Sequence, residues 1–69
     1  MSERFLPTED PVMESVLQWT VKRDAQDVRR LLEWLREARS SRERKALLER
    51  VRSLLLELEG AMNKLDELH

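Results

Sequence analysis

The sequence predicts an all-α fold, an antiparallel two-helix hairpin that pairs into a dimeric four-helix bundle. Leu, Glu, Arg, Lys and Ala dominate its 69 residues, and this composition is typical of long helices and coiled coils. There is one Gly and both Pro residues precede residue 12, so the chain lacks the turn residues of a many-stranded sheet. The short length predicts a single domain over 1–69.

The first half predicts an N-terminal arm over 1–8 and a helix over 9–39. Thr8 and Asp10 are both good N-cap residues, and Pro11 is acceptable in a first helical turn. Apolar residues then recur every three or four positions, as on one face of a helix. In heptad notation these seam residues occupy positions a and d, and Asp24 is a polar residue at d. The seam of this half consists of Leu17, Val21, Val28, Leu31 and Leu35.

The second half predicts a helix over 40–68 whose heptad phase differs by two residues from that of the first half. A slip of this size rotates the apolar stripe by about 200° on a continuous helix, which favours a break at Ser40-Ser41. Ser40 and Glu43 match a capping box, although no Gly or Pro enforces a stop and a continuous helix is the alternative. We expect the helix to pass through Gly60. The seam of this half consists of Leu47, Val51, Leu54, Leu58 and Leu65.

Both stripes are wider than one hairpin can bury. Ala25 and Leu32 widen the first stripe, and three residues at position e widen the second: Leu48, Leu55 and Met62. Burying a Leu or Val side chain is worth about 1.5 to 3 kcal/mol, so we expect a second copy of the chain to cover this surplus.

Charge is unevenly distributed although the net formal charge is only −1. Residues 1–20 carry −3, 21–35 carry +1, 36–52 carry +4 and 53–69 carry −3. A hairpin places the basic segment at the turn and both acidic segments at the open end. Antiparallel stacking of two hairpins would set each basic turn beside an acidic end, so we expect that orientation.

The sequence offers little for catalysis, and we predict no enzyme, metal or cofactor. Without Cys there is no thiol nucleophile or thiolate zinc site, and no Gly-rich loop is present to hold phosphates. The terminal residue His69 is expected to fray. Asp24 is expected to set register or to contact a partner. Four carboxylates avoid a and d and are expected to be solvated: Glu57, Glu59, Asp66 and Glu67.

The remaining pattern favours a small protein-protein interaction module, such as a regulator, inhibitor or assembly adaptor. Val16 and Trp19 lie off the seam and are candidate partner contacts, whereas Trp34 is expected in the core. The basic turn is a further candidate, and it also supports the alternative of nucleic-acid binding: Arg39, Arg42, Arg44 and Lys45. No apolar run of 18 residues or signal-peptide pattern occurs, so we expect a cytoplasmic protein without a membrane partner.

Overall fold

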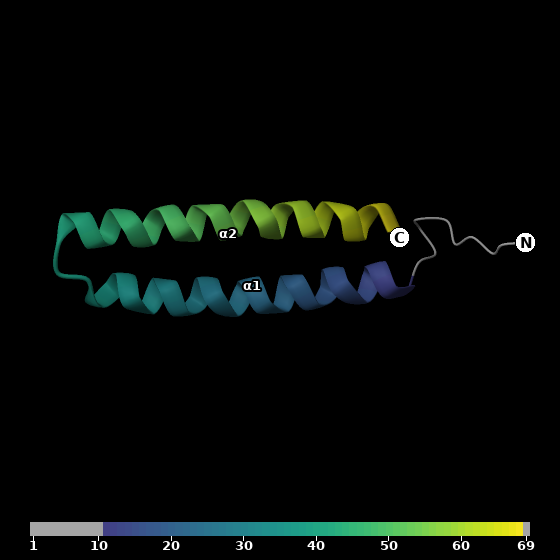
Figure 1. The fold of residues 1–69 in the computed structure, drawn as a ribbon, viewed down its shortest axis with the longest axis horizontal. Helices are drawn as coiled ribbons and strands as arrows, with labels where there is room; N and C mark the ends of the chain where they lie inside the picture. The colour runs from purple at the N-terminus through teal and green to yellow at the C-terminus, as the bar shows by residue number, and fades with distance from the viewer. Residues whose placement is uncertain (1–10, 69) are drawn as a thin grey trace, which may run out of the picture.

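The described residues form an all-α hairpin, which confirms the predicted two-helix architecture. The computed structural model describes residues 11–68, and there α1 (Pro11–Glu37) and α2 (Ser41–Leu68) have 27 and 28 residues. The two helices run antiparallel and pack against each other along their length (Figure 1). The predicted arm over 1–8, a helix start at 9 or 10 and His69 lie outside the described residues.

The helix is interrupted over residues 38–40, next to the predicted Ser40-Ser41 break, so the alternative of one continuous helix is wrong. The Glu43 amide donates to Ser40 Oγ at 3.0 Å, and the Arg44 amide donates to the Ser40 carbonyl at 3.0 Å. These bonds make Ser40 the N-cap of α2. The reciprocal bond differs from a standard capping box, because the Glu43 carboxylate accepts from the Arg39 amide, at 3.2 Å, instead of from the cap residue.

The first helix ends earlier than expected. It was predicted to reach residue 39, but it ends at Glu37. The Ala38 amide donates to the Leu35 carbonyl at 3.2 Å, a contact between residues three apart. Such a bond tightens the last turn, and the chain then leaves the helix toward the Ser40 cap.

The core of the hairpin is small. Leu31, Val51 and Leu54 are buried against one another, and Val28 and Leu47 pack on them from either helix. Ala61 and Asp24 are the other buried residues in the described part of the chain. The rest of the predicted seam is partly buried: Leu17, Val21, Leu35, Leu58 and Leu65.

α2 continues through Gly60, as expected. This glycine has no positive φ, and a Cβ built on it would meet nothing within 4 Å. Neither a turn nor a close helix approach therefore requires glycine at this position.

Candidate interaction surfaces

Many large apolar side chains stay exposed on the hairpin. Among the described residues there are ten such side chains: Val12, Met13, Val16, Trp19, Leu32, Trp34, Leu48, Leu55, Leu56 and Met62. Single exposed apolar residues are common on soluble proteins, whereas a clustered set marks an interaction surface.

One side of the hairpin gathers five apolar residues, and we call it the apolar side face. In an antiparallel pair the e positions of both helices lie on one side of the seam and the g positions on the other, because the helices run in opposite directions. Position e of α1 holds Ala25 and Leu32, with the polar Gln18 toward the open end. Position e of α2 holds Leu48, Leu55 and Met62, with Ser41 at the turn. Ala25 is exposed, and the four larger side chains are 46 to 53% exposed.

The opposite side of the seam is polar. A groove of about 170 Å³ is lined in part by Asp27 and Trp34 of α1 and by Arg50 of α2, all at position g. This shared lining places the g positions of both helices together, as the antiparallel geometry requires. Trp34, which was expected in the core, is 52% exposed in the hairpin, because position g lies beside the seam.

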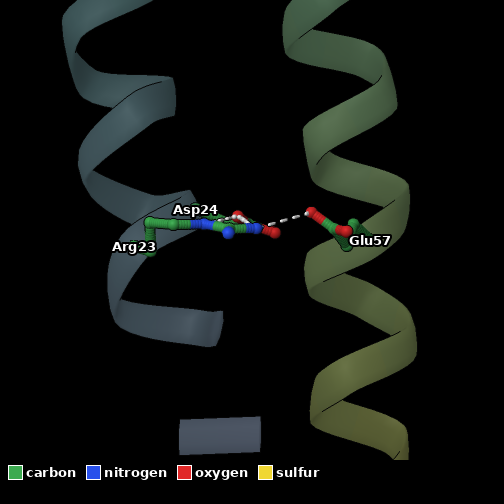
Figure 2. A network of polar contacts seen from close by, with 3 residues as sticks. All are labelled: Arg23, Asp24 and Glu57. Carbon is green, nitrogen blue, oxygen red and sulfur yellow. Dashed lines mark hydrogen bonds and ion pairs between the residues drawn. The ribbon is translucent and has the colours of Figure 1, made fainter. Parts of the chain in front are cut away.

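A charged cluster crosses the hairpin near its middle. Asp24 is fully buried, and its Oδ1 accepts hydrogen bonds from Arg23 Nε at 3.2 Å and Nη2 at 3.1 Å. The same Nη2 lies 3.6 Å from Glu57 Oε1, so the guanidinium extends from α1 toward α2 (Figure 2). Asp24 Oδ2 is buried without a hydrogen-bond partner. Asp24 is thus held through Oδ1 by Arg23, and its Oδ2 has no donor as long as Glu57 is ionised.

Asp24 also changes the acidity of the carboxyl group facing it. A side-chain hydrogen bond to Asp24, and then the negative charge of Asp24, raise the pKa of Glu57 above its ordinary value, while Arg23 and Arg50 act in the opposite direction. Two ionised carboxylates cannot hydrogen bond to each other, whereas a protonated Glu57 can donate to Asp24. The cluster therefore binds a proton more readily than an isolated glutamate.

Sequence reasoning missed the cross-helix part of this cluster. Glu57 was placed among the solvated carboxylates and Arg23 was not singled out. A usable signal was present, because Asp24 and Glu57 are almost equally far along the chain from the Ser40 turn. Residues equidistant from a hairpin turn lie at the same level.

The predicted partner contacts Val16 and Trp19 lie on the outer surface of α1, where they are 54% and 58% exposed. The guanidinium carbon of Arg23 lies 4.9 Å from the centroid of the Trp19 ring, a cation–π contact. Trp19 also lines an open groove of about 460 Å³ with Val21 and Leu65. The ring is held in place by Arg23 and still offers most of its surface to solvent.

The four predicted basic contacts at the turn are all exposed: Arg39, Arg42, Arg44 and Lys45. Within residues 11–68, Arg23 is the one cation with an ion pair inside 4.0 Å. The interspersed acidic residues thus do not pair with the basic turn in the hairpin, and its charges face solvent.

Other kinds of site find no support in the described residues. No group of three or more His, Asp or Glu side chains there is arranged to hold a metal ion. Neither α1 nor α2 is long and apolar enough to cross a membrane. Comparisons with protein-family models, with curated proteins and with solved structures give no match.

Proposed function

We propose that this protein is a non-enzymatic protein-protein interaction module that works as a homodimeric helical hairpin. Two copies would pair into a four-helix bundle and present a second surface to another protein, as a regulator, inhibitor or assembly adaptor does. The observation that carries the proposal is the apolar side face, whose large side chains stay about half exposed on the hairpin. Removing that remaining half from water is worth about 1 kcal/mol per side chain, and a symmetric dimer gains it on both copies.

Sedimentation equilibrium tests the dimer. Leu55→Lys places a charge on the apolar side face and is expected to weaken dimerisation strongly. Leu56→Lys is the matched control, because Leu56 is the next residue but points away from that face, where it is 65% exposed. A wild-type protein that sediments as a monomer at high micromolar concentration would overturn the proposal. Equal effects of the two lysines would show that the apolar side face is not the dimer surface.

The second surface of the module is Val16 with Trp19. Interface hot spots are enriched in tryptophan, and a ring that is already oriented by Arg23 loses little side-chain entropy on binding. The double variant Val16→Ala with Trp19→Ala is expected to remain dimeric in sedimentation but to lose the proteins that wild type captures from its native host. Capture unchanged by the double variant would exclude this surface.

Nucleic-acid binding by the basic turn is the second candidate function, favoured by its four exposed and unpaired basic side chains. Phosphate contacts predict binding to labelled RNA or duplex DNA that weakens steeply from low to moderate salt. Arg42→Ala with Arg44→Ala should abolish such binding. No gel shift at low salt would rule this candidate out.

A further inference from the structure

We infer that two copies of the hairpin meet through their apolar side faces about a two-fold axis beside Leu55, with the turn of one copy next to the open end of the other. This inference rests on the proposed dimer and specifies its geometry. It predicts that α2 packs antiparallel on α2 of the second copy, and α1 on α1.

The apolar residues of α2 are spaced symmetrically about Leu55. Leu48 and Met62 are each seven residues from it, at the same heptad position. A two-fold axis at Leu55 therefore places Leu55 against its own copy and Leu48 against Met62 of the second copy. The surface is then complementary to itself, as an isologous interface requires.

The charged residues beside the apolar side face share the same symmetry. Position b of α2, which flanks position e, holds Lys45 and Arg52 before Leu55 and Glu59 and Asp66 after it. To within one residue, the same axis places Arg52 beside Glu59 of the second copy, and Lys45 beside Asp66 of the second copy. Each of these ion pairs occurs twice in the dimer, so four attractive contacts fix the orientation more than the stability.

The other symmetric arrangement is electrostatically worse. With both turns at the same end, α2 would pack on α1 of the second copy. Counting equal distances from the Ser40 turn, Arg29 of α1 is level with Arg52, and Arg36 with Lys45. That arrangement places basic residues against basic residues at these two levels. Its one attractive pairing among the charged b positions, Lys22 with Glu59, does not offset both repulsive ones.

The α1 helices contribute shape more than charge to the inferred dimer. Ala25 and Leu32 complete the apolar side face, and position b of α1 holds three basic residues and no acid: Lys22, Arg29 and Arg36. Repulsion between the α1 helices opposes the attraction between the α2 helices. Salt dependence of the dimer is therefore a poor test, and the individual pairs must be probed.

Disulfide trapping reads the axis position directly, because the chain has no cysteine of its own. Leu55→Cys is expected to oxidise to a covalent dimer under mild conditions. Leu48→Cys is the matched control: its two thiols would be separated by 14 residues of helix rise, about 21 Å, beyond disulfide reach. The double variant Leu48→Cys with Met62→Cys should cross-link again. Equal oxidation rates for the two single variants would overturn the inferred axis.

A charge swap tests orientation and leaves the apolar side face intact. Arg52→Glu alone and Glu59→Arg alone each make two repulsive contacts, and each is expected to raise the dimer dissociation constant about tenfold at low salt. The two changes together should restore wild-type affinity. A double variant as weak as the single ones would refute the antiparallel pairing.

The proposed dimer and its inferred geometry are refuted by different results. A wild-type monomer in sedimentation removes both the dimer and its geometry. A wild-type dimer that Leu55→Cys does not trap and the charge swap does not restore would leave the proposed function standing and overturn only this arrangement.

Discussion

Replacing Asp24 with leucine is expected to stabilise the hairpin, although Asp24 is its most buried residue. Asp24 is fully buried at a d position, where a coiled coil favours an apolar residue. One of its oxygens has no hydrogen-bond partner, and an unsatisfied buried acceptor costs about 1 to 3 kcal/mol. The substitution Asp24→Leu removes that cost and adds apolar burial.

The size of the expected stabilisation depends on the contacts that the Asp24→Leu substitution removes. The two hydrogen bonds from Arg23 disappear, but the Arg23 side chain is 46% exposed and regains water. Arg23 keeps Glu57 as a partner, so removing the Asp24 carboxylate leaves no buried charge unpaired. We therefore expect Asp24→Leu to stabilise the hairpin by about 1 to 3 kcal/mol, the cost of the unsatisfied acceptor.

Urea denaturation followed by helical circular dichroism measures the effect, with all variants at one chain concentration because dimerisation would contribute to stability. The urea midpoint should rise without a change in the slope of unfolding free energy against urea concentration. Asp24→Asn is the matched control, since it keeps the shape, removes the charge and should return the pKa of Glu57 toward its ordinary value. A lower midpoint for Asp24→Leu would refute the argument that the buried carboxylate destabilises the hairpin.

Three further substitutions test individual features of the structure by urea denaturation. The pKa of Glu57 is raised in the fold, so its protonation stabilises the fold. The full effect is present below the ordinary glutamate pKa of 4.5 and is lost as pH rises through the folded value. Glu57→Gln should therefore match wild type near pH 4 and gain on it toward pH 7; a constant difference would argue against the coupling. Gly60→Ala should stabilise by about 1 kcal/mol, because α2 is helical there and nothing lies within 4 Å of the new Cβ; no gain would mean that Gly60 has another role. Ser40→Ala should destabilise by about 0.5 to 2 kcal/mol through loss of the N-cap, and an unchanged midpoint would show that water replaces the Oγ contact.

The periodic features of this fold can be predicted from the sequence, because the position of a residue along a helix determines the direction in which its side chain points. The heptad frame placed Leu31, Val51 and Leu54 among the seam residues, and the structure buries these three together. The slip between the two frames indicated a break close to Ser40. The Ser40 cap followed from local chemistry, since its hydroxyl needs only an amide three residues on. Features that repeat with every heptad, and contacts that lie within one helical turn, could therefore be predicted.

Contacts that depend on side-chain reach could not be predicted in the same way. Arg23 lies outside the seam, and only its long side chain brings the guanidinium to Glu57 on the other helix. The frame likewise gives Trp34 a position beside the seam but does not say whether the neighbouring helix covers it. These outcomes depend on the register of α1 against α2 and on the rotamers that it permits.

The buried carboxylate of Asp24 and the exposed leucines both bear on the stability of the isolated hairpin. A hairpin that buries few apolar side chains, and buries Asp24 among them, has little stability of its own. The charged cluster also favours a single register of α2 against α1, because sliding α2 by one turn would take Glu57 away from Arg23. That register determines where Ala25 and Leu32 stand relative to Leu55, and hence whether the apolar side face fits a second copy. Asp24 would thus lower the stability of the isolated hairpin while helping to specify the surface of the proposed dimer. If that dimer restores the lost stability, as we propose, folding and association form a single equilibrium.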